Sequence, residues 1–265
     1  MKALRLLACA AALLSGGVAL GQSRPLHLES FEDKVGVAGD IRATVEHQFA
    51  MTSAALKDPS HWCEILLLHL DTKDCHVSTE GNYTFVGVGV VSKYDQPASS
   101  AYRVSFVYHL VEDSAASLRV RLDADAGPLG TSNYRILLEA EPMEDGRTSI
   151  HMSYSYSYGV LARVAMSAYL ATFGRNKVGF TVVGNESDGT PRYIGGTRGV
   201  VERNTMRYYL AVEAYLGATS LPPEARMEKS LRDWYSAIER YPRQLHEMEQ
   251  GDYLAMKRRE FAKAS

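Results

Sequence analysis

The segment Arg147–Arg175, RTSIHMSYSYSYGVLARVAMSAYLATFGR, constrains the fold more than any other part of the chain. As far as Tyr158 it alternates strictly: apolar and aromatic side chains hold one parity, while His151 and three serines hold the other. A period of two predicts a β-strand with one buried and one solvated face. Gly159 ends the alternation, and the Ala- and Leu-rich run Val160–Thr172 predicts a helix. A helix with such small side chains can lie over a curved sheet and leave space beneath it.

Other strand-like segments, several of them alternating and one apolar on both parities, precede this one and are separated by turn residues. They predict strands at Ile41–Phe49, Cys75–Val77, Tyr83–Val91, Arg103–Val111, Leu118–Asp123 and Tyr134–Glu141. The links between the later strands have hairpin length, which favours antiparallel neighbours. Two short helices are expected after the first strand: Met51–Lys57, and one that opens with Asp58-Pro59-Ser60-His61-Trp62, with Ser60 at the N-cap position.

The last third of the chain predicts one more strand and several helices. The strand is Val178–Val183, and a helix with an apolar stripe follows at Val200–Gly217. The charged segment Glu224–Gln250 also has helical spacing, and Pro242 should kink or split it. Its apolar residues recur at spacings of three and four: Leu231, Trp234, Ile238, Tyr241, Leu245 and Met248. This stripe predicts a packing face, with a docking surface for a partner as the alternative.

The N-terminus has the features of a signal peptide, which we assign to residues 1–21. Lys2 and Arg5 form a charged start, and the apolar run Leu6–Leu14 is too short to span a bilayer. Ala19 and Gly21 suit a signal-peptidase site, with an uncleaved anchor as the alternative. Export to a bacterial periplasm is therefore expected, and the short signal and few cysteines favour it over secretion from a eukaryotic cell.

The charge and hydropathy of the remaining chain limit its partners. The formal net charge is -2, and it becomes -4 once the two basic residues of the signal peptide are removed, so nothing suggests a nucleic-acid partner. No later apolar run reaches the roughly 18 residues of a membrane span, so no transmembrane segment is expected in the mature chain.

Two cysteines, Cys63 and Cys75, remain after the signal peptide. In an oxidising compartment, a pair twelve residues apart in the sequence is expected to form a disulfide. Such a loop would contribute about 3 kcal/mol to stability if unstrained. Two buried thiols are the alternative. No CxxC or HxxxH spacing accompanies the pair, so no metal site and no cofactor are expected.

The order strand, two short helices, six strands, helix resembles the START-like (SRPBCC, helix-grip) superfamily. That superfamily includes the Bet v 1 allergens, polyketide cyclases and aromatases, and lipid-transfer domains. The resemblance covers Gly39–Gly174 and includes the helix opening at Asp58-Pro59-Ser60-His61-Trp62. It implies an α+β fold in which a curved antiparallel sheet grips a long helix, with a deep apolar cavity between them. It carries no catalytic residue over to this chain.

The resemblance also sets the expected domain organisation. We assign residues 22–38 to an N-terminal arm, 39–218 to a helix-grip domain and 219–265 to a C-terminal helical extension. Two segments compete for the role of the gripping helix. We favour Val160–Thr172, because it follows the last strand directly, over Val200–Gly217.

Tyrosine is the residue type that best indicates what the cavity would hold. The chain has 16 tyrosines and 7 phenylalanines, and a buried tyrosine hydroxyl requires a hydrogen-bond partner. The inward parities place seven residues in the expected lining: Phe106, Tyr108, Tyr134, Met152, Tyr154, Tyr156 and Tyr158. This lining suits a hydrophobic or amphipathic small molecule such as a lipid. The alternative is an ordinary aromatic core whose hydroxyls reach solvent at the strand ends.

No catalytic motif supports an enzyme. His109 and His151 lie on the parity opposite the aromatic residues, so both are expected on the outer face of the sheet. A binding protein is therefore favoured. Two alternatives remain: a cyclase-like or hydrolytic enzyme that uses a tyrosine or histidine as general acid or base, and an envelope protein that docks a partner through Glu224–Phe261.

Overall fold

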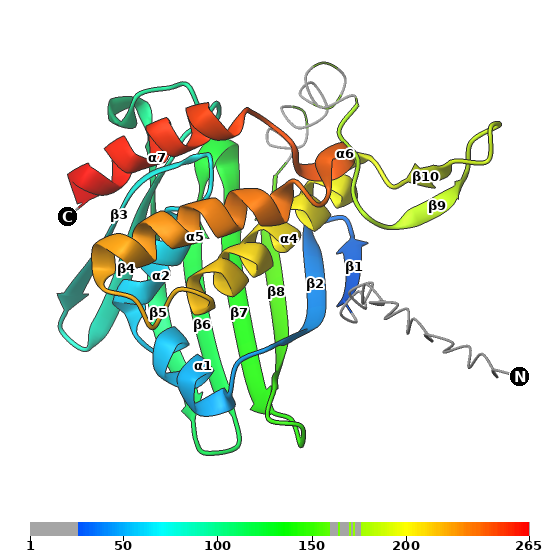
Figure 1. Cartoon of the computed structure of the whole chain (residues 1–265). Helices are drawn as coiled ribbons and strands as arrows, with labels where there is room; N and C mark the ends of the chain where they lie inside the picture. The colour runs from blue at the N-terminus through cyan, green and yellow to red at the C-terminus, as the bar shows by residue number, and fades with distance from the viewer. Residues whose placement is uncertain (1–25, 160–163, 165–169, 171, 173–175, 265) are drawn as a thin grey trace, which may run out of the picture.

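The computed structural model describes residues 26–159, 164, 170, 172 and 176–264 of the chain. One layer is an eight-stranded antiparallel sheet with the strand order β1-β2-β8-β7-β6-β5-β4-β3 (Figure 1). Strands β3 to β8 form a meander, and β2 pairs with β8, the last strand of that meander. The strands are β1 Leu26–Glu32, β2 Gly36–Val45, β3 Thr72–Glu80, β4 Tyr83–Val90, β5 Tyr102–Asp113, β6 Leu118–Ala126, β7 Thr131–Pro142 and β8 Thr148–Tyr158.

Strand β8 confirms the alternation that the sequence predicts. Ile150 and Met152 are fully or almost fully buried on the inner face, while His151 points to the outer face. Met152 stands opposite Ile41 of β2 and opposite Leu138 of β7. Since all three side chains lie on the same inner face, the register places one continuous apolar surface across these three strands.

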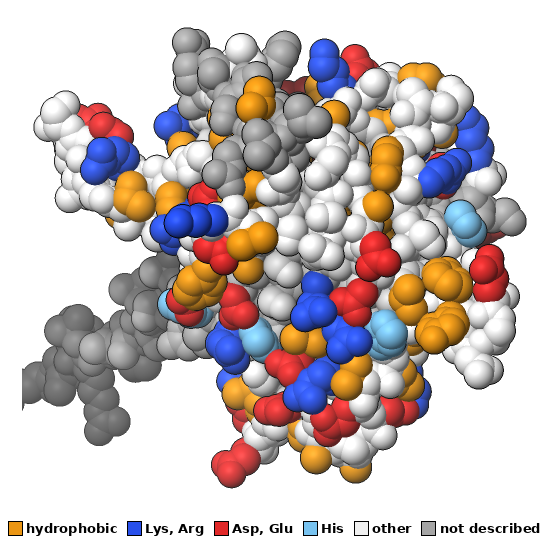
Figure 2. Space-filling model, turned by 180° about the vertical axis from the view of Figure 1, so that it is seen from behind, with side chains coloured by type: hydrophobic (Ala, Val, Ile, Leu, Met, Phe, Trp, Pro, Cys, Tyr) orange, Lys and Arg blue, Asp and Glu red, His pale blue; other side chains and the backbone are white. Residues whose placement is uncertain are grey.

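The outer face of the sheet carries intermixed acidic, basic and histidine side chains (Figure 2). His151 Nε2 lies 2.6 Å from an oxygen of Asp40, and its Nδ1 lies 2.7 Å from an oxygen of Glu139. His109 Nε2 lies 3.5 Å from an oxygen of Asp123. The predicted outer-face position of both histidines is therefore confirmed.

The helices form two further layers on the inner face (Figure 1). The long helix α4 contacts β1, β2 and β8 on one side, and α5 packs on it from the other. A small hairpin of β9 and β10 precedes α4. The bounds are α1 Phe49–Leu56, α2 Pro59–Leu66, β9 Val182–Asn185, β10 Pro191–Tyr193, α4 Gly196–Leu216, α5 Pro223–Ile238, α6 Pro242–Leu245 and α7 Gln250–Ala264. The helix-grip α+β fold is confirmed, with C-terminal helices outside the gripping helix.

The gripping helix is α4, which corrects the preference for Val160–Thr172. The earlier segment lies mostly outside the described residues. Helix α4 has 21 residues, of which 14 are buried, including charged positions such as Glu202 and Arg203. It can hold the central position because it is covered by the sheet on one side and by helices on the other. Adjacency to the last strand was therefore a misleading criterion.

The N-terminal arm expected at residues 22–38 is also corrected. Its residues Leu26–Glu32 form β1, which pairs with β2 along its whole length, and β2 begins at Gly36 instead of Ile41. β1 is an edge strand, and most of its side chains remain at least partly exposed. A polar edge strand has a weak alternation, which explains why this segment resembles an arm in the sequence.

The start of α2 and its cross-link fit the sequence with one change. The side chain of Asp58 accepts a hydrogen bond from the backbone N of Ser60 at 2.8 Å, and Pro59 occupies the first helical position. The N-cap is therefore Asp58, because proline at N1 moves the cap one residue before it. The predicted disulfide is confirmed: Cys63 of α2 is bonded to Cys75 of β3.

The C-terminal helices are interrupted as Pro242 predicts, with α5 ending before it and α6 beginning at it. Leu231, Trp234 and Leu245 of the apolar stripe have no accessible surface. The stripe is therefore the packing face of the C-terminal helices, and these three side chains are closed to a partner protein.

Candidate functional site

Four tyrosines pack together between the sheet and α4. The ring centroid of Tyr134, on β7, lies 5.3 Å from that of Tyr156 and 6.3 Å from that of Tyr154, both on β8. Tyr154 and Tyr156 lie 5.7 Å apart, and Tyr208 of α4 joins them at 5.1 Å from Tyr154. These four residues are called the tyrosine cluster below. Its rings have the offset separations that stabilise aromatic pairs.

Three of the four hydroxyls in the tyrosine cluster have no hydrogen-bond partner among the described residues. Only Tyr134 has one, the hydroxyl of Thr131 at 2.7 Å. The hydroxyls of Tyr154, Tyr156 and Tyr208 are also absent from the fully buried polar atoms that lack a partner. They therefore retain some accessible surface, although their rings are packed. A polar group of this kind within an apolar cluster is suited to orient a ligand.

The hydroxyls of the tyrosine cluster stay protonated. Burial raises the pKa of Tyr154 well above its ordinary value, and the neighbouring hydroxyls of Tyr208 and Tyr134 add to the effect. Burial likewise raises the pKa of Tyr156 and of Tyr208. Each hydroxyl can therefore both donate and accept a hydrogen bond at neutral pH.

His69 extends the line of rings beyond the tyrosine cluster. It lies in the link between α2 and β3, with its ring centroid 4.2 Å from that of Tyr208 and 5.9 Å from that of Trp234 of α5. Burial lowers the pKa of His69 well below its ordinary value, and the positive charges of Arg207 and Lys257 act in the same direction. The imidazole is therefore neutral, and its buried Nε2 has no partner in the described part of the chain.

Asp71 lies two residues after His69. Burial raises the pKa of its carboxyl, against the opposing effect of Arg207. The residue as a whole is nevertheless exposed. Its carboxylate forms no hydrogen bond or ion pair within the described residues.

Buried ion pairs lie close to this carboxylate. Lys73 Nζ and Lys257 Nζ donate to the two oxygens of Glu260 at 2.6 and 2.8 Å, and Lys257 also donates to the carbonyl of Thr72 at 2.7 Å. Burial lowers the pKa of Lys257 to about 8, although the negative charge of Glu260 opposes the shift. These contacts attach α7 to β3 beside Asp71.

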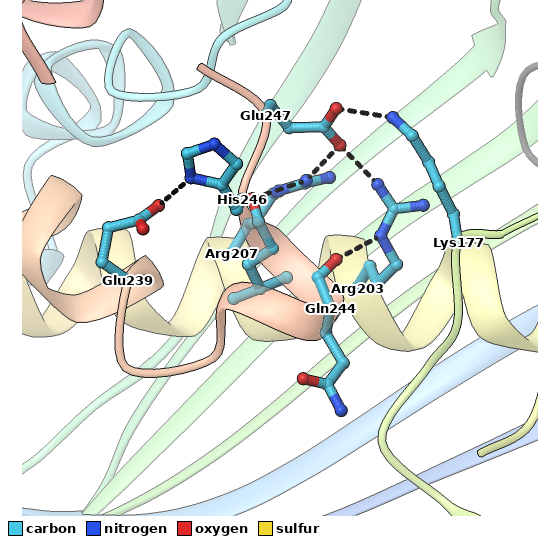
Figure 3. A network of polar contacts seen from close by, with 8 residues as sticks. Lys177, Arg203, Arg207, Glu239, Gln244, His246 and Glu247 are labelled. Carbon is cyan, nitrogen blue, oxygen red and sulfur yellow. Dashed lines mark hydrogen bonds and ion pairs between the residues drawn. The ribbon is translucent and has the colours of Figure 1, made fainter. Parts of the chain in front are cut away.

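A second network surrounds Glu247, after α6 (Figure 3). Its carboxylate accepts from Lys177 Nζ at 2.5 Å, from Arg203 at 2.6 Å and from Arg207 at 2.8 Å. Burial alone would raise the pKa of this carboxyl, but the three cations outweigh it and lower the pKa. The network ties the link between α6 and α7 to the gripping helix, one residue from Tyr208.

Comparison with known proteins places the chain by its fold only. No family model matches the chain, and no curated protein matches its sequence. Solved structures do align with it. Norcoclaurine synthase from Thalictrum flavum is 16% identical, covering 66% of this chain and 91% of that chain, with a TM-score of 0.35. The Zhui aromatase/cyclase from Streptomyces sp. R1128 is 12% identical, covering 78% and 95%, with a TM-score of 0.38.

A third aligned structure is human StAR-related lipid transfer protein 5, 9% identical over 56% of this chain and 79% of that chain, with a TM-score of 0.34. The chain is similar to START-like proteins. At TM-scores below 0.5 these alignments carry no argument about ligand or activity. The helix-grip fold itself is seen in the strand order and in the position of α4.

The structure brings together only part of the seven-residue lining that the sequence predicts. Tyr134, Tyr154 and Tyr156 are in contact. The ring centroid of Tyr158 lies 6.2 Å from that of Tyr156, and its hydroxyl donates to Glu32 of the edge strand at 2.7 Å. Tyr108 is separate, because its hydroxyl donates to the carbonyl of Lys57 at the end of α1, at 2.7 Å. The two remaining members are buried in the inner-face core: Phe106 and Met152.

Two hollows lined by described residues lie away from the tyrosine cluster. The larger, of about 490 Å³, lies between β1 and the residues Thr181 and Arg198. The smaller, of about 370 Å³, lies between His47 and the facing ends of α4 and α5. The predicted ligand cavity beneath the gripping helix therefore stays a prediction.

Sequence reasoning missed Tyr208, His69 and Asp71. The apolar stripe of the α4 segment selects its neighbour Tyr209, because a stripe identifies only one buried face and α4 is covered on two. His69 and Asp71 lie in a short link whose position depends on distant segments. The only available signal was an acidic residue and a histidine placed between a predicted helix and a predicted strand.

Metal and membrane sites were also sought in the described ranges. No three or more His, Cys, Asp or Glu side chains in those ranges come close enough to bind a metal ion. None of the helices in the same ranges is both long and apolar enough to cross a bilayer.

Proposed function

We propose that the chain is an exported, periplasmic protein that binds a hydrophobic or amphipathic small molecule between its sheet and α4. The observation that supports this most directly is the set of three unpaired hydroxyls on Tyr154, Tyr156 and Tyr208. The packed rings would contact the apolar part of the ligand, and the hydroxyls would bind its polar end. Affinity would come from apolar burial, and selectivity from the positions of these hydroxyls.

Native mass spectrometry of the purified full chain tests the binding function. The expected result is a bound small molecule of defined mass, which organic extraction removes and which binds again when it is added back. A panel of lipids and aromatic amphiphiles tests the same point on protein that has been extracted. A chain that carries no small molecule and binds no member of the panel would overturn the proposal.

Export is tested by expressing the full chain in a bacterium and separating the periplasm from the cytoplasm. The expected product is a periplasmic protein whose N-terminus is Gln22. Full-length protein retained in the cytoplasm would contradict export. This result would leave the ligand-binding proposal unaffected, because the tyrosine cluster does not involve residues 1–21.

An enzyme that uses the same site is the second candidate. The observation that favours it is the position of His69 against the ring of Tyr208, with Asp71 two residues away. A neutral imidazole and a carboxyl with a raised pKa are the groups that general acid–base catalysis requires. A cyclase-like or hydrolytic reaction would return a ligand of changed mass after incubation. Recovery of the unchanged ligand would favour binding alone.

A further inference from the structure

A hollow of about 490 Å³ runs beside β1, the outermost strand of the sheet (Figure 1). Six consecutive residues of this strand line it, from His27 to Glu32, together with Thr181 and Arg198. Neighbouring side chains of a strand point to opposite faces of the sheet, so a hollow lined by all six lies along the backbone edge and not over one face. Because β2 occupies the other edge of β1, this edge is the free one. The hollow is called the edge groove below.

The backbone of β1 can bind a further strand in the edge groove. An antiparallel strand directs the N–H and C=O groups of alternate residues to each of its two edges. β1 pairs with β2 over all seven of its residues, and no other strand of the described chain pairs with it. Outside that pairing, its backbone forms no hydrogen bond within the described residues. The outward groups are therefore unpaired, which is the condition for adding a peptide strand.

Arg198 provides a fixed positive charge at the side of the edge groove. Its Nε donates to the hydroxyl of Ser30 at 3.0 Å, and Ser30 in turn donates to Glu202 at 2.6 Å. Ser30 and Glu202 are buried, and Glu202 also accepts from the backbone N and the hydroxyl of Thr181, at 2.9 and 2.7 Å. The terminal nitrogens of Arg198, Nη1 and Nη2, have no hydrogen-bond or ion-pair partner within the described residues. A guanidinium held in this way at Nε offers both terminal nitrogens to a carboxylate.

The remaining charges of the edge groove define where an acidic side chain of a bound strand would be stable. Glu32 shares the face of Ser30, because the two lie two residues apart on β1. Glu29 lies on the opposite face, where it stands across from Asp40 of β2. Like charges that face each other across strands are unfavourable. An acid is therefore favoured opposite Ser30, beside Arg198, and disfavoured opposite either glutamate.

We infer that the edge groove binds an extended peptide segment of another protein, which adds to β1 as an antiparallel ninth strand and places an aspartate or glutamate against Arg198. Backbone hydrogen bonds along β1 give affinity, and the ion pair fixes the register. Phe31, which is 58% exposed and lies on the face of Glu29, gives the segment an apolar contact. The edge groove shares no residue with the tyrosine cluster, so this inference stands apart from the proposed ligand binding.

Fluorescence anisotropy with labelled octapeptides tests strand addition on the purified full chain. The parent probe contains threonine and valine around one central aspartate. Two further probes carry N-methyl groups on alternate residues, one on the odd set and the other on the even set. In an antiparallel strand whose aspartate faces Arg198, only one set of amides faces β1. One methylated probe should therefore bind at least about tenfold more weakly than the other. Equal affinity of the two methylated probes would overturn strand addition.

A probe with asparagine in place of the aspartate tests the ion pair. On wild type it should bind about tenfold more weakly than the parent probe, as expected for a charge-assisted hydrogen bond. Arg198→Met should bring the two affinities within about twofold of each other, because the carboxylate then has no cation. Arg198→Gln, which keeps a neutral donor, should show a reduced preference and serves if the methionine variant does not fold. Arg243→Met, at an exposed arginine of α6 outside the edge groove, should keep the wild-type preference.

Further results would also overturn the inference: equal affinity of the aspartate and asparagine probes for wild type, a full preference in both Arg198 variants, or no binding of any probe. Sedimentation of the chain without peptide tests the other occupant of a free strand edge, a second copy of the chain. A dimer that the parent probe dissociates would assign the edge groove to self-association and overturn the binding of a partner segment. A monomer that binds the parent probe is the expected result.

Discussion

The ring centroid of Tyr208 lies 4.2 Å from that of His69, and this contact joins the gripping helix to the link between α2 and β3. From Tyr208 the ring contacts continue to Tyr154 on the sheet, and from His69 they continue to Trp234 on α5. One aromatic path therefore crosses all three layers at the candidate site. The rings fix the geometry there, and the unpaired hydroxyls remain for a ligand.

Removal of the Tyr208 hydroxyl should affect binding and not stability. Tyr208→Phe breaks no hydrogen bond within the described residues, so the free energy of unfolding should change by less than about 0.5 kcal/mol. Binding of an aromatic amphiphilic probe that the wild type binds should weaken about three- to tenfold, as expected for one neutral hydrogen bond. Urea unfolding and calorimetric titration measure the two quantities.

Tyr108→Phe is the matched control for this variant. It removes a hydroxyl that donates to the carbonyl of Lys57, away from the tyrosine cluster. It should lower the free energy of unfolding by about 1 kcal/mol and leave probe affinity unchanged. If Tyr208→Phe instead destabilised the chain and bound the probe normally, its hydroxyl would have a structural role only.

Local sequence patterns predicted strand β8, the disulfide and the break between α5 and α6, because each of these depends on a few residues that lie close together in the sequence. The alternation from Ile150 to Tyr158 predicts β8, since a period of two requires a strand with one buried face. The pair Cys63 and Cys75 predicts the disulfide, because these are the only two cysteines that follow the expected signal peptide. The break at Pro242 follows from the missing N–H of proline.

The missed features depend on packing between segments distant in the sequence. β1 is held by its pairing with β2, and its buried Ser30 donates to Glu202, 172 residues later. Tyr208 lies on a helix covered on both sides, where a single apolar stripe does not describe the buried surface. Asp71 is identified as part of the site only when its surroundings are known, because its sequence neighbours carry no motif.

Removal of the disulfide should weaken the attachment of α2 to β3. The double variant Cys63→Ser, Cys75→Ser releases a short loop in the unfolded chain, so the free energy of unfolding should fall by about 3 kcal/mol. Urea unfolding of the oxidised wild type and of the variant measures this loss. The reduced wild type should behave like the variant. Equal stability of the oxidised and reduced wild type would contradict the prediction.

The network of Glu247 should make stability depend on acid pH. Its cations lower the pKa of the carboxyl in the folded state, so its contribution is complete above the pKa of the unfolded chain, near 4.5. The contribution is lost as the pH falls through the lower pKa of the folded state. Glu247→Gln leaves three cations without their acid and should cost on the order of 3 kcal/mol at neutral pH.

The difference between wild type and Glu247→Gln should shrink when unfolding is measured at progressively lower pH, below about pH 4.5. Glu224→Gln, at an exposed residue in the first turn of α5, is the control, and its effect should stay within about 0.5 kcal/mol. A constant difference between wild type and Glu247→Gln down to strongly acidic pH would contradict the assignment.

Lys257 should give the opposite dependence, at alkaline pH. Burial lowers the pKa of its ammonium group from 10.5 to about 8, so between these values the unfolded chain holds a proton that the folded chain has released. The free energy of unfolding should therefore gain roughly 1 kcal/mol per pH unit from this group as the pH rises from about 8 to 10, a gain that is absent below about pH 8.

Lys257→Met removes the group, while Lys73 still pairs with Glu260. Urea unfolding across this range should show wild type gaining stability relative to Lys257→Met, whereas the exposed control Lys229→Met should run parallel to wild type. Parallel curves for wild type and Lys257→Met would mean that the buried ammonium keeps its proton throughout the range, held by Glu260 and the carbonyl of Thr72.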